Sequence, residues 1–195
     1  MTPPNLLTLS RLVLAVIMMA LLSVAMPFAK SLALVVFVIA GITDYLDGYL
    51  ARTVYGVTAF GRLMDPLTDK VLICAAFVGF VELRLVPAWI VVVIISREFL
   101  VTGLRLLAAG KGEIIPAGKW GKHKTIWQII AIAALLLGAA IRDDLLRGAD
   151  AQTLADYDFA FRFVALAVSL GVAIITLASG FMYFMQHRNL IHGRG

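Results

Sequence analysis

Four aspartates in two closely spaced pairs are the residues of this sequence best suited to chemistry. Asp44 and Asp47 form one pair, and Asp65 and Asp69 form the other. Residues three or four positions apart share one face of a helix, so each pair would present two carboxylates side by side. The surrounding sequence is strongly apolar, and each acid at membrane depth costs roughly 2.5–3.5 kcal/mol on insertion scales. Divalent cations bind carboxylate oxygens and cancel their charge, so the pattern predicts a two-metal site at a membrane surface.

Small residues flank both pairs. Gly48 and Ala51 continue the face of the first pair almost without side chains, and Arg52 can reach into the same space. Gly61 lies one turn before Asp65. Two metal ions can bridge a diphosphate during an in-line displacement, and a carboxylate can take the proton of an attacking hydroxyl. The alternative, structural ion pairs with nearby arginine and lysine side chains, accounts for one or two of the carboxylates but not for all of them.

The composition is that of a membrane protein. The chain has 195 residues, of which 62% are hydrophobic, and its mean hydropathy is +0.96. Soluble domains are roughly 45–50% apolar. We therefore expect a single membrane domain over residues 1–195. The lone Cys74 excludes an internal disulfide. The net charge of +5 comes without zinc-ligand spacing or an RNA-binding aromatic motif, so no nucleic-acid partner is expected.

Hydropathy predicts an all-α fold with six transmembrane helices, each about 17–25 residues long. The predicted spans are Ser10–Phe28, Ser31–Tyr49, Leu63–Val81, Pro87–Leu107, Thr125–Ile141 and Phe161–Met185. The connections after the first and third spans are short, which predicts antiparallel hairpins.

Basic residues predict the orientation of these spans. Most of them lie on the side that holds both termini, which the positive-inside rule assigns to the cytosol. The segment Arg142–Asp158 falls on the opposite side, carries several aspartates, and is predicted to be a solvated loop without a catalytic role. Both aspartate pairs are then expected near the cytosolic boundary of the bilayer.

The aspartate segment carries a family resemblance. The pattern Asp-x2-Asp-Gly-x2-Ala-Arg-x8-Gly-x3-Asp-x3-Asp, from Asp44 to Asp69, resembles the signature of the CDP-alcohol phosphatidyltransferase family. The resemblance implies a six-helix membrane fold, usually a homodimer, with two Mg²⁺ (or Mn²⁺) ions between the second and third helices. It implies that Asp44 and Asp65 contact both ions. Asp47 and Asp69 would contact one each, with Asp69 also the general base.

The resemblance also implies a site for CDP-diacylglycerol in the signature segment, at the residues Gly48, Arg52, Thr58 and Gly61. Asn5, Thr8 and Arg11 lie where the first helix enters the membrane and are candidates for contact with the nucleotide. The alternative is that the polar residues cap that helix and the arginine sets the topology.

Basic residues in the second half predict a site for an anionic acceptor. Arg97 and Arg105 are eight positions apart and share a helical face, while Lys122, Lys124 and Thr125 open the fifth span. An arginine inside a span usually faces a cavity or a partner, and guanidinium and ammonium groups bind phosphate. These five residues form the predicted acceptor-phosphate site. The alternative for the lysines is a role in topology and lipid contact.

Two further motifs, one near the N-terminus and one at the start of the fifth span, sharpen the expected reaction. Pro4-Asn5-Leu-Leu-Thr8 and Gly121-Lys122-His-Lys124-Thr125 resemble members of the family whose acceptor is sn-glycerol 3-phosphate. The implied reaction gives phosphatidylglycerophosphate and CMP in the inner (plasma) membrane of a bacterium, with the active site facing the cytosol. One alternative is another acceptor such as inositol phosphate. A second is a cation transporter, which predicts acids along a line through the bilayer, whereas these cluster at one face.

Overall fold

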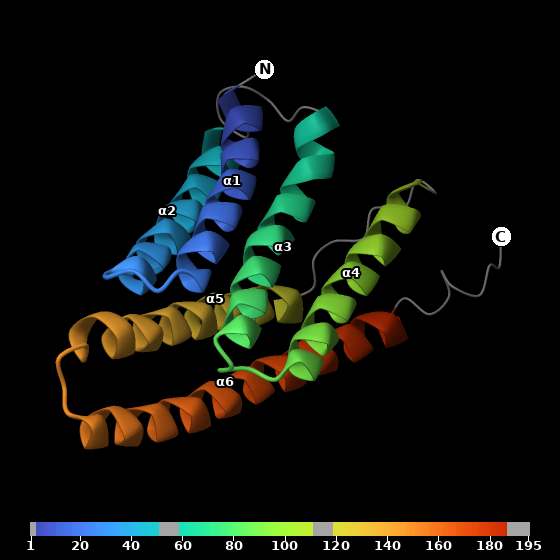
Figure 1. Cartoon of the computed structure of the whole chain (residues 1–195). Helices are drawn as coiled ribbons and strands as arrows, with labels where there is room; N and C mark the ends of the chain where they lie inside the picture. The colour runs from blue at the N-terminus through green and yellow to red at the C-terminus, as the bar shows by residue number, and fades with distance from the viewer. Residues whose placement is uncertain (1–2, 51–58, 111–118, 187–195) are drawn as a thin grey trace.

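The computed structural model describes residues 3–50, 59–110 and 119–186, and this part of the chain is helical, without strands (Figure 1). Its α-helices are α1 (Pro3–Ser23), α2 (Ala29–Leu50), α3 (Ala59–Glu82), α4 (Ala88–Gly110), α5 (Lys119–Ala140) and α6 (Ala151–Gln186). A short π-helix, η2 (Ile141–Leu145), continues α5. The all-α prediction is confirmed.

Two stretches of the described chain are long and apolar enough to cross a membrane, Lys124–Leu145 and Ala151–Gln186. A third apolar stretch, Leu9–Ser23, is shorter. Large apolar side chains such as Phe163 and Ile174 are exposed on the surface of the bundle. Such a surface is unusual for a soluble monomer and is consistent with contact with lipid. The other predicted spans and the orientation of the termini stay predictions.

The prediction of a loop over Arg142–Asp158 was wrong at both ends, where η2 and α6 are helical, whereas residues 146–150 form a mostly exposed turn. Helix α6 begins at Ala151, because the carboxylate of Asp150 caps it. This carboxylate accepts hydrogen bonds from the Thr153 N–H at 3.1 Å and the Thr153 hydroxyl at 2.7 Å. Both bonds favour the ionised form and hold the pKa of Asp150 below its ordinary value. The sequence alone does not show which acids of this segment cap a helix and which are only solvated.

Another acid of this segment caps a distant helix. The carboxylate of Asp144 accepts hydrogen bonds from the N–H groups of Phe28 and Ser31, at 2.8 and 2.9 Å, and from the Ser31 hydroxyl at 2.6 Å. It therefore satisfies two backbone donors at the start of α2. Nearby, the buried ammonium group of Lys30 donates to carbonyls at the end of α1, including that of Val24 at 3.2 Å. These polar contacts fix the first hairpin at one end of the bundle.

The helices pack in a way that gathers the aspartate-bearing segments. Helix α1 packs against α2 and α3, α4 packs against α6, and α5 packs against both α2 and α6. Met18, Phe77, Phe80 and Leu136 are fully buried between them. Figure 1 shows that α2 ends and α3 begins at the end of the molecule that holds the N-terminus. The two helices that carry the aspartate pairs therefore present them at the same end of the bundle, with α1 packed against both helices.

Candidate active site

The predicted site residues differ in how far the structure describes them. Arg52 and Thr58 lie outside the described residues. Others lie on described helices, but their side-chain environments lie outside the described part: Asn5, Thr8, Asp47, Gly48, Gly61, Asp65, Asp69 and Lys122. Described in full are Asp44, Arg97, Arg105, Lys124 and Thr125.

The backbone sets the positions of the two aspartate pairs. Asp44 and Asp47 lie in the last turns of α2, and Asp65 and Asp69 lie in the first turns of α3. The interval between members of each pair is about one helical turn, so each pair shares a face of its helix. The end of α2 and the start of α3 lie at the same end of the bundle (Figure 1).

Asp44 is paired with an arginine from the first helix. The Arg11 guanidinium donates from Nη1 to Oδ1 of Asp44, and the pair joins α1 to α2. The Arg11 side chain is 2% exposed, whereas that of Asp44 is 52% exposed. The buried arginine thus compensates the carboxylate from inside, while the other side of the carboxylate stays open to ligands.

A cavity of about 480 Å³ adjoins this pair, between α1, α2, α3 and α5. Its walls are mostly apolar, and its polar lining residues are Arg11, Asp44 and Thr125. Apolar lining comes from residues such as Phe37 and Leu72. An apolar chamber that ends at a carboxylate suits an amphiphilic ligand with a polar group at one end.

A second cluster surrounds a buried carboxylate on α4. Glu98 is only 4% exposed. Its Oε1 accepts a hydrogen bond from the Lys124 ammonium group, and its Oε2 accepts one from Lys70 at 3.2 Å. The Gln128 amide donates to Oε1 at 3.4 Å, and Nη1 of Arg97 lies 3.7 Å from the same oxygen. Three cations and one anion from three helices thus share a space that is largely closed to solvent.

Helix α6 holds Arg97 from the other side. Its Nη2 donates to the Ser179 hydroxyl at 3.0 Å. A Cβ atom added to Gly180 would lie 2.8 Å from the Cγ atom of Arg97, which is too close for a real contact. The absence of a side chain at Gly180 therefore lets α6 pack directly on the arginine.

The structure divides the predicted acceptor residues between two places. Arg97 and Lys124 meet at Glu98. Thr125 lines the cavity that contains Asp44, and Arg105 is exposed two turns after Arg97 on α4. The described members of the predicted set therefore do not form one shell around a single point.

Several residues of these clusters were not among the predicted site residues. They are Lys70, Glu98, Gln128 and Ser179. The available signal was their polarity inside apolar helices, since ionisable groups at membrane depth are usually retained for a partner or a function. Which partner each one has depends on helix packing, and the sequence does not reveal it.

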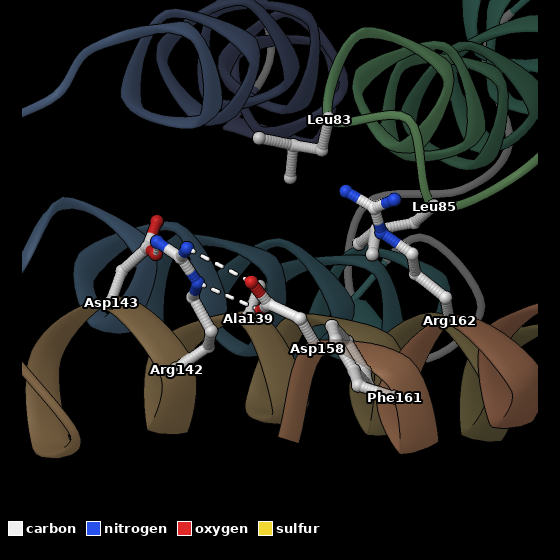
Figure 2. Close-up of a pocket in the computed structure, with 8 residues that line it drawn as sticks. All are labelled: Leu83, Leu85, Ala139, Arg142, Asp143, Asp158, Phe161 and Arg162. Carbon is white, nitrogen blue, oxygen red and sulfur yellow. Dashed lines mark hydrogen bonds and ion pairs between the residues drawn. The ribbon is translucent and has the colours of Figure 1, made fainter. Parts of the chain in front are cut away.

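A polar cavity also lies at the opposite end of the bundle. It has a volume of about 230 Å³, and Figure 2 shows its lining residues, with Arg142 between two carboxylates. Arg142 donates to Asp158 at 3.0 and 3.1 Å and to Asp143 at 2.8 Å. The bonds to Asp158 connect η2, which follows α5, to the start of α6. Because the arginine is already satisfied by these acids, we interpret the cluster as a structural link between the two helices.

The donor atoms on α2 and α3 suit hard divalent cations. The four aspartates supply carboxylate oxygens, which Mg²⁺ and Mn²⁺ prefer over nitrogen or sulfur ligands. The open side of the Asp44 carboxylate leaves room for an ion beside Arg11. On this chemistry, the residues present fit a divalent-metal site.

Comparison with known proteins agrees with the signature. The family model for CDP-alcohol phosphatidyltransferase matches residues 1–175. The chain is 40% identical to CDP-diacylglycerol–glycerol-3-phosphate 3-phosphatidyltransferase of Bacillus subtilis over 94% of both chains. It is 35% identical to the enzyme of the same name from Rickettsia bellii, over 70% of this chain and 75% of that one. A probable phosphatidylglycerophosphate synthase of Mycobacterium tuberculosis is 40% identical, over 68% of this chain and 65% of that one.

The matched region contains both aspartate pairs and the Arg11–Asp44 contact. It also contains Glu98 and its three basic partners, but it ends before Ser179 and Gly180 of α6. With the family model covering most of the chain and one relative aligned over nearly its full length, the chain belongs to the CDP-alcohol phosphatidyltransferase family.

Proposed function

We propose that this protein transfers the phosphatidyl group of CDP-diacylglycerol to sn-glycerol 3-phosphate, with phosphatidylglycerophosphate and CMP as products. The observation that carries the proposal is the 40% identity, over 94% of both chains, to a relative named for this reaction. The complete aspartate signature from Asp44 to Asp69 supports the same chemistry.

The proposed roles follow from the chemistry of the side chains. Asp44, Asp47, Asp65 and Asp69 would hold two divalent cations, which supply charge neutralisation at the diphosphate when bound. Asp69 takes the proton from the 1-hydroxyl of glycerol 3-phosphate. The hydroxyl oxygen then attacks the phosphorus that bears diacylglycerol, and CMP leaves. Arg11 balances the charge of Asp44 from the buried side.

Substrate binding is proposed at two neighbouring regions. The nucleotide lies against the ends of α1, α2 and α3, near the residues Asn5, Thr8, Gly48, Arg52, Thr58 and Gly61. The phosphate of the acceptor lies near the basic residues of α4 and the start of α5, namely Arg97, Arg105, Lys122 and Lys124, with Thr125 nearby. Diacylglycerol stays in the bilayer, and the apolar cavity beside Asp44 supports a lipid substrate.

The cellular setting is part of the proposal. The protein crosses the inner (plasma) membrane of a bacterium with six helices and both termini in the cytosol. Its active site then faces the cytosol, where nucleotide and glycerol 3-phosphate are dissolved. A homodimer is proposed from the family resemblance.

The test is an assay in detergent micelles with CDP-diacylglycerol and Mg²⁺. Radiolabelled glycerol 3-phosphate, serine and inositol phosphate are offered separately, and each reaction is repeated with EDTA and with EDTA followed by excess Mg²⁺ or Mn²⁺. The expected result is lipid product with glycerol 3-phosphate alone, lost with EDTA and restored by the metal. Product with a different acceptor would refute the proposed acceptor and keep the reaction class.

Activity that survives complete removal of metal would contradict the two-metal mechanism. Absence of product with every acceptor, in a folded sample, would contradict the transfer reaction itself. Metal-dependent cation flux in liposomes made from that sample would then support the transporter alternative.

A further inference from the structure

The charges around Glu98 do not cancel. Lys70, Arg97 and Lys124 supply three positive charges, and Glu98 is the carboxylate that pairs with them within the described part of the chain. The side chains of Lys124 and Glu98 are 4% and 5% exposed, and those of Arg97 and Lys70 are 10% and 20% exposed. Among the described side chains, this group therefore has an excess of two positive charges in a space with little water.

A buried cluster with excess positive charge contributes little to the stability of the fold. Removing ions from water is costly, and well-packed apolar residues often replace a buried ion pair at no loss of stability. An excess of cations makes this balance worse, because like charges repel in a medium of low dielectric constant. A phosphate monoester carries close to two negative charges at neutral pH, so it complements the excess charge of this cluster.

The cluster also connects the helices that carry the two halves of the proposed site. Lys70 directly follows Asp69 on α3, and Lys124 lies two residues after Lys122 on α5. Glu98 bonds to both lysines from α4, and Arg97 extends the connection to α6 through Ser179. A single carboxylate thus fixes the spacing between the helix of the proposed base and the helices of the proposed acceptor residues.

We propose that Glu98 is a positioning residue of the acceptor site: it gathers Lys70, Arg97 and Lys124 into one cluster whose two uncancelled positive charges select an acceptor with a phosphate dianion. This inference rests on the proposed function and adds a role for a residue that the aspartate signature does not include. Glu98 acts through the cations that it orients, and it does not itself contact the reacting atoms.

The experiment compares Glu98→Gln, Glu98→Asp and the unchanged protein at saturating Mg²⁺. Glu82→Gln is the matched control, because Glu82 is an exposed glutamate that bonds only to Ser23 at 2.8 Å among described side chains. For each protein, KM and kcat are measured for glycerol 3-phosphate and KM for CDP-diacylglycerol, together with competitive inhibition by inorganic phosphate and the thermal unfolding midpoint.

In Glu98→Gln the cluster gains net positive charge, but its three cations lose the carboxylate that orients them. The KM for glycerol 3-phosphate is therefore expected to rise about tenfold or more, the equivalent of one lost charge-assisted contact. Inhibition by inorganic phosphate should weaken in parallel, while kcat and the KM for CDP-diacylglycerol change little. Glu98→Asp keeps a carboxylate on a side chain one methylene shorter. Its KM for glycerol 3-phosphate should lie between those of the unchanged protein and Glu98→Gln. Glu82→Gln should match the unchanged protein.

Several results would overturn the role of Glu98. They are an unchanged or lower KM for glycerol 3-phosphate in Glu98→Gln, or an equal rise for both substrates. If Glu98→Gln does not fold, Glu98→Asp decides: a selective rise in acceptor KM supports the proposal, while normal kinetics or a second folding failure assigns Glu98 a structural role only. These results concern the variants only, and the proposed function stands as long as the unchanged protein makes product. A lack of product from the unchanged protein would instead refute the proposed function.

Discussion

At the scale of single residues, the chain keeps acids inside apolar helices by giving them cationic partners. Asp44 is paired with the buried Arg11, and Glu98 is surrounded by three basic side chains. The two acids differ in one respect that matters for function. Asp44 remains half-exposed and open to a ligand, whereas Glu98 is closed off by its own partners. The first arrangement suits a metal ligand and the second suits a positioning group.

A substitution at Asp69 tests the proposed base. Asp69→Asn removes the proton acceptor and one anionic metal ligand while it preserves size, so kcat should fall by roughly 100- to 10,000-fold or more. The measurement is steady-state transfer to glycerol 3-phosphate at saturating Mg²⁺. Asp156→Asn is the control, since Asp156 is exposed near the start of α6 and bonds to Gln152 at 3.1 Å. Near-normal turnover in Asp69→Asn would exclude Asp69 as the base.

At the scale of helices, α5 and α6 are held together by close packing. Helices α5 and α6 approach each other closely at Gly138, where an added Cβ atom would overlap the ring of Phe161. The Tyr157 hydroxyl also donates to the Gly138 carbonyl at 2.8 Å, and the rings of Tyr157 and Phe161 are 5.7 Å apart. The aromatic pair thus seats α6 on the glycine of α5, close to the Arg142–Asp158 link.

A methyl group at Gly138 should disturb this contact. Gly138→Ala forces the Phe161 ring to move, and overpacking of this kind typically destabilises a protein by about 1–3 kcal/mol. A drop of several degrees in the thermal unfolding midpoint in detergent is expected, at roughly 2–4 °C per kcal/mol for a chain of this size. Gly148→Ala provides the control, since no atom lies within 4 Å of a Cβ at that position. Equal midpoints for both variants would show that α5 and α6 do not approach each other this closely.

At the scale of the whole molecule, the polar groups separate between the two ends of the helices. Asp44 lies near the end of α2 that Figure 1 shows on the side of the N-terminus. The acids that cap or link helices, Asp144, Asp150 and Asp158, lie in η2 and around the start of α6. The basic residues that predict the orientation are concentrated toward the first end. The proposed topology therefore places chemistry on the cytosolic side and structural ion pairing on the outer side.

Cysteine labelling tests this topology. With Cys74→Ala as background, a cysteine in place of Gly148 in the turn before α6 should react with a membrane-impermeant maleimide in spheroplasts. A cysteine in place of Gly110, at the end of α4, should react only after the membrane is permeabilised, because positive-inside orientation puts this end in the cytosol. The opposite labelling pattern would invert the proposed orientation and place the aspartates outside.

The sequence by itself determined the all-α class, the apolar helices and the membership signature, because hydropathy and helical periodicity are local properties of the chain. The pairing of Asp44 with Asp47 on one face likewise follows from spacing alone. Only the tertiary structure decided the partners of the buried charges. Arg11 and Asp44 are 33 positions apart, and Glu98 is 28 and 26 positions from its two lysines. The acid that caps α2 lies 113 positions beyond Ser31. Partners at such separations are selected by how helices pack, and an apolar helix can satisfy its periodicity with many different neighbours.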